Sequence, residues 1–419
     1  MISKLKSQGM KQAIWTIGEQ GFSSIVVFVT GILLARATTK DDFGMYVLGL
    51  SIVMIAIGFQ RAIITTPYAI LFRQQDEGEQ NKYRYATFIF QNIFLFINLL
   101  IFLVLIIYMF MSGLSDYTQF AMFLFILFVG QATLYFFKYT LISELDVKKN
   151  FVYCGLIYLT TIISLLSFYL FGDLNTNITY AVIGISAIVI SIGFYLLFFQ
   201  ASLEKINAVK LKEYFSENWK LGKWLAGSNI AFIFSSQMFP WLLFYFWDKA
   251  SVAELGVILS STRILSPAIQ GFGSFLLPKL TTLVYNNHKF TSIFRQIILM
   301  MIFVAVILVG VGYFFGETII QLIYSSKYSG LGLLITLGFV SQGIFLINMP
   351  VEIALNAQKR TDIGFSSLMI SVFVAFIIGL PMVWMYGTLG VMIGMISSGL
   401  IGLIYRYYKL REMLIKGQK

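Results

Sequence analysis

The chain has 419 residues, enough for two or three soluble domains, but 58% of them are hydrophobic and only 12% are charged. Soluble globular chains are typically about a quarter charged, so this composition excludes a large water-facing domain and indicates a membrane protein. The net charge of +11 does not indicate a nucleic-acid partner, because the basic residues fall between apolar runs rather than along one face.

Continuous apolar runs of membrane-spanning length follow one another along the whole chain. A run of about 20 apolar residues is long enough to cross the hydrocarbon core as a helix. Strands are not expected, because the runs are continuous rather than alternating. The sequence therefore predicts an all-α integral membrane protein of about twelve helices. The expected spans are residues 12–36, 43–71, 86–111, 118–142, 151–171, 178–200, 223–247, 253–280, 295–315, 331–357, 361–384 and 388–408.

Lysine and arginine are distributed unequally between the linkers that separate these runs. Most of the 30 basic residues lie in alternate linkers, whereas the remaining linkers hold only Arg36, Lys40, Lys249 and Lys327. Because cytoplasmic loops carry the excess of positive charge, the N-terminus, the C-terminus and the mid-chain linker are expected in the cytoplasm.

The longest internal linker, residues 201–222, lies near the middle of the chain. Its stretch from Leu203 to Phe215 mixes apolar and basic residues. Two interpretations fit this pattern: an amphipathic helix along the inner membrane surface, or a solvated linker that turns the chain around. We expect an N-terminal lobe of residues 1–200 and a C-terminal lobe of residues 223–419, each with half of the spans.

Several kinds of chemistry are disfavoured by the residues present. The single cysteine, Cys154, lies in an apolar run and the single histidine, His288, in a polar linker, so a His/Cys metal site is not expected. The chain has no phosphate loop of the form G-x-x-x-x-G-K-S/T. The linkers on the outer side are short, which disfavours a membrane enzyme with an outer catalytic loop. We expect neither an enzyme nor a resident cofactor.

Charged residues inside the spans are the main candidates for function, because a charge in hydrocarbon is costly and usually faces a cavity or a partner. Glu19 in the first span and Arg61 in the second lie ~10–15 Å from the cytoplasmic surface at ~1.5 Å per residue. They can form a buried ion pair that holds the two helices together. Alternatively, Arg61 lines a cationic cavity that accepts an anionic head group, and Glu19 takes part in coupling or gating.

Arg263 lies near the middle of the eighth expected span, with no equally deep acid in the adjacent spans. It is the second candidate for the cationic, substrate-binding cavity, and the alternative is a structural ion pair with Glu254 or Glu352. Glu352 follows Pro350, which removes a backbone hydrogen bond and can open the helix. Glu352 is therefore a further candidate for coupling or gating.

Two other cations lie near the ends of spans. Arg36, at the outer mouth, is either a gate residue or an ordinary solvated charge. Lys138 is expected to extend its ammonium group to the membrane interface. A stripe of small residues, Gly390, Gly394 and Ser398, predicts close helix packing in the last span.

Five short motifs, in this order, resemble those of bacterial polysaccharide-repeat-unit flippases of the Wzx type. Those flippases belong to the superfamily of multidrug, oligosaccharidyl-lipid and polysaccharide exporters, which also holds the lipid II flippase. Each motif is weak alone, but their order and spacing cover nearly the whole chain. The motifs are Gly31-Ile-Leu-Leu-Ala-Arg36, Asp42-Phe-Gly-Met-Tyr46, Tyr324-Ser-Ser-Lys-Tyr328, Leu355-Asn-Ala-Gln-Lys-Arg360 and Tyr386-Gly-Thr-Leu-Gly390.

The resemblance implies two six-helix lobes around a central cavity, as in multidrug and toxic-compound extruders. It implies alternating access that carries an undecaprenyl-pyrophosphate-linked oligosaccharide across the bacterial cytoplasmic membrane. The implied partners are membrane lipids, a polysaccharide polymerase and glycosyltransferases. Two alternatives stay open: a cation-coupled multidrug extruder and a lipid II-type flippase. The extruder is disfavoured because deep arginines, rather than acids, stand in the spans, and the lipid II flippase because its two extra spans are missing from the pattern.

Overall fold

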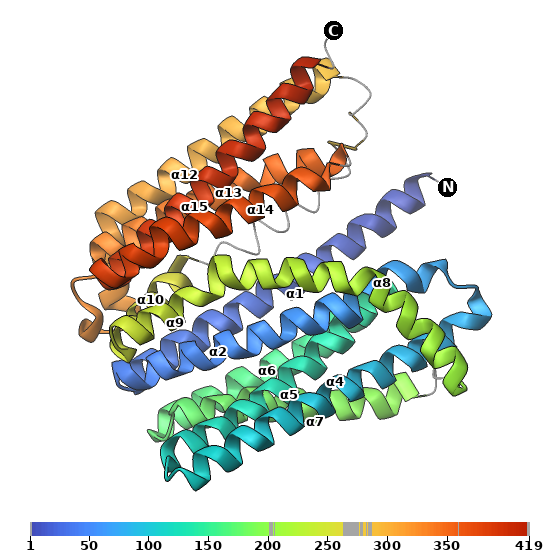
Figure 1. The fold of residues 1–419 in the computed structure, drawn as a ribbon, viewed down its shortest axis with the longest axis horizontal. Coiled ribbons are helices and arrows are strands. Elements are labelled where there is room, and N and C mark those ends of the chain that lie inside the picture. Colours follow the sequence, from blue (N-terminus) through green and yellow to red (C-terminus); the bar gives the residue numbers. More distant parts are fainter. Residues whose placement is uncertain are drawn as a thin grey trace. The chain divides into compact units, whose positions relative to one another are not determined.

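A computed structural model confirms the predicted all-α membrane fold, and all regular elements in the part that it describes are helical (Figure 1). The structure describes residues 2–200, 204, 206–262, 276, 280, 281, 283, 287–358 and 360–416.

The first half of the chain forms long helices that are interrupted by short π and 3-10 turns. These elements are α1 (Ile2–Ala37), α2 (Lys40–Gln60), η1 (Arg61–Thr65), α3 (Thr66–Leu71), η2 (Phe72–Gln74), α4 (Glu77–Met111), α5 (Ser115–Ser143), α6 (Val147–Phe171), α7 (Thr176–Phe194) and η3 (Tyr195–Phe199).

The second half of the chain also forms helices that are interrupted by short π and 3-10 turns. Its elements are α8 (Ala208–Phe232), η5 (Ile233–Gln237), α9 (Met238–Phe246), α10 (Lys249–Thr262), α12 (Asn287–Ile323), η7 (Ser326–Tyr328), α13 (Gly332–Ala357), α14 (Thr361–Val374), η8 (Ala375–Gly379) and α15 (Leu380–Lys416).

The described residues contain ten helical segments that are long and apolar enough to cross a membrane. The last of these segments is a hairpin, because Gly387 interrupts it with a φ of 56° and a ψ of −129°. The expected spans 361–384 and 388–408 are therefore two separate arms. The expected span 253–280 lies largely outside the described residues, which include α10 and a few later positions of it.

Contacts within the chain group it into two compact units. The first contains Met1–Thr38 and Gly49–Asn229, and the second contains Thr39–Leu48 and Ile230–Lys419. In the first unit α5 packs against α4 and α7, and α1 packs against α6. In the second unit α13 packs against α12 and α15, and α14 packs against α15.

Residues 208–222 of the expected mid-chain linker form the start of α8, which continues without interruption to Phe232. Two side chains of this segment, Tyr214 and Asn218, are almost fully buried. The Tyr83 hydroxyl donates a hydrogen bond of 2.5 Å to Asn218 Oδ1, and the Tyr83 and Tyr214 rings pack edge to face at 5.0 Å. This segment is therefore anchored to α4, and the division into lobes at 201–222 stays a prediction.

Each unit has its own apolar core, whereas long helices expose rows of large apolar side chains. Tyr68, Phe136 and Tyr153 are buried in the first unit, and Phe239 and Val391 in the second. By contrast, α4 exposes Phe96, Leu103, Val104 and Phe110, and α12 exposes Phe303, Val306, Ile307 and Phe314. Such contiguous apolar faces suit a surface that contacts lipid rather than water.

The predicted small-residue stripe forms a close helix contact within the second unit. Gly390 packs against the backbone of Met382 on the other arm of the hairpin, and Gly394 packs against Gly379. The Ser371 hydroxyl donates a hydrogen bond of 3.1 Å to the Ser398 carbonyl. Small side chains at these positions let the two backbones approach, as expected for packed membrane helices.

Candidate functional site

Arg61 lies where a single long span changes its helical pitch. The chain runs through α2 into the π turn η1, which begins at Arg61, and then into α3, whose first turn contains Pro67. Proline has no N–H to donate to the carbonyl four residues earlier, and a wider turn before it accommodates the missing bond. Pro67 thus explains locally why the helix widens at Arg61.

The side chain of Arg61 is exposed and lies against an aromatic ring. Its guanidinium carbon is 5.1 Å from the centre of the Tyr139 ring of α5. Tyr139 in turn stacks on Tyr135, with ring centres 5.9 Å apart and planes 17° apart. Among the described residues, no carboxylate oxygen lies within 4.0 Å of the Arg61 guanidinium. The structure therefore presents an accessible cation within a membrane-spanning helix.

Glu19 does not pair with Arg61, which corrects the ion pair considered from the sequence. Lys138 Nζ of α5 lies 2.8 Å from Glu19 Oε1, and the Tyr158 hydroxyl of α6 donates to the same oxygen at 3.0 Å. Only 1% of the Glu19 side chain and 12% of the Lys138 side chain are exposed. The depth of a residue along its span does not specify which face of the helix the residue occupies.

The same contact shows that the expectation for Lys138 was wrong. Lys138 lies five residues before the end of α5, close enough for its ammonium group to reach the interface. Its side chain instead points into the first unit, where Glu19 neutralises it. A buried ammonium group requires such a partner, and Glu19 supplies it at hydrogen-bonding distance.

A second buried polar network lies directly beside Arg61 and was not identified from the sequence. Gln60, which is fully buried, donates to Gln91 Oε1 at 2.8 Å and to the Ala132 carbonyl at 2.7 Å. Glutamines inside apolar runs were the available signal, because an amide in hydrocarbon needs a partner. This network joins the α2 end to α4 and α5 and fixes the helix from which Arg61 projects.

In the second unit, both acids that were considered as partners of Arg263 contact other cations. Lys40 Nζ lies 3.1 Å from Glu254 Oε1, and Arg406 Nη1 lies 3.1 Å from Glu352 Oε2. Arg263 itself lies outside the described residues. Its role in substrate binding stays a prediction, and so do the coupling or gating roles of Glu19 and Glu352.

Arg36 lies in the last turn of α1 and is exposed, as expected for a residue at a helix end. Its role as a gate residue also stays a prediction.

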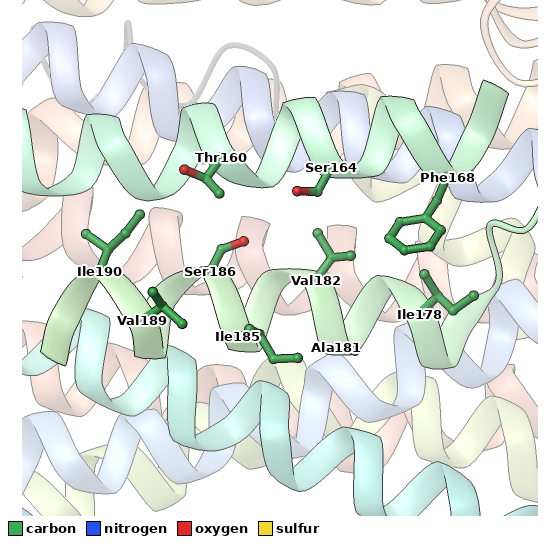
Figure 2. Close-up of a pocket in the computed structure, with 10 residues that line it drawn as sticks. All are labelled: Thr160, Ser164, Phe168, Ile178, Ala181, Val182, Ile185, Ser186, Val189 and Ile190. Atoms are coloured by element: carbon green, nitrogen blue, oxygen red, sulfur yellow. The ribbon is translucent and has the colours of Figure 1, made fainter. Parts of the chain in front are cut away.

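A pocket of about 510 Å³ lies within the first unit between α6 and α7. Figure 2 shows Thr160 and Ser164 of α6 across from Val182 and Ser186 of α7. Thr160, Ser164 and Ser186 contribute hydroxyl groups, and the other side chains that line the pocket are apolar. An apolar pocket between two spans suits a hydrocarbon chain rather than a charged group.

Comparison with solved structures identifies the fold. The lipid II flippase MurJ in an inward closed conformation matches with a TM-score of 0.68 and 15% identity, over 95% of this chain and 87% of that chain. A mutant of the Vibrio cholerae MATE transporter VcmN matches with a TM-score of 0.63 and 17% identity, over 98% of both chains.

A MOP superfamily transporter from Pyrococcus furiosus, described as having a binding pocket of reverse polarity, matches with a TM-score of 0.62 and 13% identity. That match covers 97% of this chain and 96% of the transporter. No protein-family model matches the sequence, and no curated protein matches it either. The chain therefore has the fold of MATE transporters and MurJ, in a multi-pass membrane protein whose structural neighbours are transporters rather than enzymes.

Proposed function

We propose that this chain is a flippase that carries an undecaprenyl-pyrophosphate-linked oligosaccharide repeat unit across a bacterial cytoplasmic membrane by alternating access. The proposal is supported by the order of the sequence motifs and by the MATE- and MurJ-like fold. The observation that carries it is the charge at Arg61. In the first unit the intramembrane acid Glu19 is neutralised and buried, whereas Arg61 is exposed and has no described carboxylate beside it.

An exposed arginine at this depth favours an anionic ligand for a physical reason. A guanidinium group in hydrocarbon is costly, so Arg61 has to face water, another part of the protein or a ligand. The Tyr139 ring stabilises the cation through its face. The planar donors of arginine match the oxygens of a phosphate group. Arg61 therefore fits the pyrophosphate that links the lipid to the sugar.

The multidrug extruder is the competing interpretation, and the same contacts disfavour it. A site that binds organic cations needs an accessible acid at membrane depth. Glu19 is buried and paired with Lys138, and Glu352, although half of its side chain is exposed, is neutralised by Arg406. The Pyrococcus furiosus transporter provides a parallel, since the reverse polarity of its pocket is said to suggest a different function. In the present chain, the exposed Arg61 favours an anionic ligand.

The proposed role involves no bond formation or cleavage by this chain. Glycosyltransferases would build its substrate on the inner leaflet, and a polymerase would use the product on the outer leaflet. Both termini and the mid-chain linker would then lie in the cytoplasm, on the side where the substrate is loaded.

Deletion of the gene in its own host tests the proposal. We expect loss of a surface polysaccharide and accumulation of lipid-linked repeat units, both restored by the wild-type gene. Normal surface polysaccharide together with new sensitivity to cationic drugs would contradict the flippase and support the extruder. Loss of cell-wall precursor export would support the lipid II-type alternative instead.

A further inference from the structure

A polar stripe lies on the exposed face of α13 in the second unit. Glu352 and Asn356 are exposed on this face, one helical turn apart, and Asn348 precedes Glu352 by another turn. The opposite face is apolar and includes the buried Pro350 and Ala354. Polar groups one turn apart in a span face water or a ligand, because hydrocarbon cannot solvate them.

Arg406 of α15 makes one polar contact with the residues that the structure describes, and this contact is with Glu352 of the stripe. Its Nη1 donates to Glu352 Oε2 at 3.1 Å. Only 12% of the Arg406 side chain is exposed, against 51% of the Glu352 side chain. The acid is therefore the accessible member of the pair, and the arginine is fixed in the protein.

The buried Nε–H group of Arg406 is left without a hydrogen-bond partner among the residues that the structure describes. The Asn348 Oδ1 atom is likewise buried and accepts no hydrogen bond from the described residues. Asn348 lies two helical turns before Asn356, nearer the middle of α13. A buried donor on a charged group is expensive to leave unpaired, so native proteins rarely keep one without a reason.

The guanidinium edge formed by Nε and an Nη atom is the donor pair that binds a phosphate or carboxylate through two oxygens. Glu352 bonds only to Nη1, which is not on the same edge as Nε–H, so both two-donor edges of the guanidinium group, Nε with Nη2 and Nη1 with Nη2, remain incomplete among the described residues. A phosphate group that displaced Glu352 would engage the two donors of one edge. Pro350 lies two residues before Glu352 and removes one backbone hydrogen bond from the same turn, which eases movement of that turn.

We propose that Arg406, together with the exposed face of α13, forms an anion site for the phosphate groups of the lipid-linked substrate, and that Glu352 occupies this site when the substrate is absent. This inference rests on the proposed function and assigns it a second phosphate contact, within the second unit. Sequence reasoning missed Arg406 because it falls in the basic segment that ends the chain and was counted there as a cytoplasmic charge.

The test measures binding of two probes to the purified full-length chain in detergent: farnesyl pyrophosphate and inorganic pyrophosphate. Removing the internal competitor with Glu352→Gln should tighten farnesyl pyrophosphate binding about fivefold, the size expected from a partly exposed ion pair. Arg406→Gln should weaken binding about tenfold or more, because charged hydrogen bonds are lost. Arg406→Lys should be intermediate. Lys409→Gln, which removes a cation one turn further along α15, is the matched control and should bind like the wild type.

A purely structural ion pair predicts a different outcome. Glu352→Gln would then lower thermal stability without any gain in affinity, and that result would overturn the site. The double variant Glu352→Gln/Arg406→Gln leaves no unpaired charge and should lose the gain shown by Glu352→Gln. If the gain persists, Arg406 is not the ligand. Equal affinity for the two probes would overturn the assignment to a lipid-linked group.

Failure of this inference and failure of the proposed function give different results. A chain that is required for surface polysaccharide, but whose Glu352→Gln variant gains no affinity, would retain the flippase function and lose only this site. A chain that shows the predicted binding pattern, but whose deletion leaves surface polysaccharide intact, would retain the anion site and lose the flippase function.

Discussion

Lys138 and Glu19 form a buried charge pair within the first unit. The pair neutralises and buries the acid, whereas Arg61 is exposed. Breaking a buried pair from one side costs about 3–5 kcal/mol, because it leaves an uncompensated charge. The stability of the first unit should therefore depend on both members together.

We expect Lys138→Met alone to lower stability by about 3–5 kcal/mol, and the double variant Glu19→Gln/Lys138→Met to recover most of it. The measurement is the fraction of monodisperse protein that survives heating in detergent. Lys149→Met is the control, since its ion pair with Asp146 is exposed and should contribute about 0–1 kcal/mol. If Lys138→Met is as stable as Lys149→Met, the buried pair does not hold the helices.

Arg61 should affect transport rather than folding, because its side chain is exposed. We expect Arg61→Ala to reduce transport per folded molecule about tenfold or more, through loss of charged hydrogen bonds to phosphate. Arg61→Lys should retain part of the activity, since it keeps the charge without the planar fork. Lys148→Gln, at an exposed lysine of α6, removes the same charge and should transport normally. Arg61→Ala transport at the wild-type rate would remove Arg61 from the substrate site.

At this scale the sequence identified charged residues within the spans but did not predict their partners. Arg61 and Glu19 were identified by their depth, which follows from counting residues along a helix. The Glu19–Lys138 contact depends on the rotation of α1 and α5 about their axes, which a uniformly apolar run does not encode. Arg263 carried much of the sequence argument and lies outside the described residues.

The helical elements were predicted closely because each span is a continuous apolar run. Their internal irregularities were not predicted. The π turn that begins at Arg61 and precedes Pro67 is seen only in the structure. The start of α8 was expected to be a surface helix or a linker, and its buried Tyr214 and Asn218 show that it packs against α4.

The hairpin that turns at Gly387 within α15 depends on close backbone contact between Gly390 and Met382. An added Cβ there would meet the Met382 carbonyl, so Gly390→Ala should destabilise the protein by about 1–3 kcal/mol through overpacking. Gly364→Ala on α14 is the matched control, because nothing lies within 4 Å of its added Cβ. Apparent melting temperatures in detergent compare the two. Equal melting temperatures would show that the hairpin tolerates a wider separation.

The orientation of the whole molecule in the membrane rests on the distribution of lysine and arginine. Single-cysteine variants in a Cys154→Ser background should be labelled by an impermeant thiol reagent from the cytoplasmic side at Gln80→Cys and Lys212→Cys. Ser325→Cys should be labelled from the outside. Outside labelling at Lys212→Cys would contradict the predicted cytoplasmic position of the mid-chain segment, and with it the cytoplasmic termini.

The fold at this scale was predictable from composition and the motif order, and MATE transporters and MurJ share it. The substrate was not predictable from the sequence. A sugar contacts a few polar side chains that follow no fixed sequence pattern, whereas a membrane span is recognised from the length of its apolar run. In the proposed function, the charge at Arg61 indicates an anionic ligand but does not identify the sugar.

The proposed flippase function is tested most directly by measuring on which leaflet the lipid-linked repeat units lie. Spheroplasts from the host, depleted of the protein and then supplied with wild-type or Arg61→Ala protein at equal folded amounts, would be treated with a membrane-impermeant reagent that oxidises sugars. We predict that the wild type moves the lipid-linked glycan to the oxidised, outer pool and that Arg61→Ala leaves it protected. Equal oxidation with and without the protein would contradict the account.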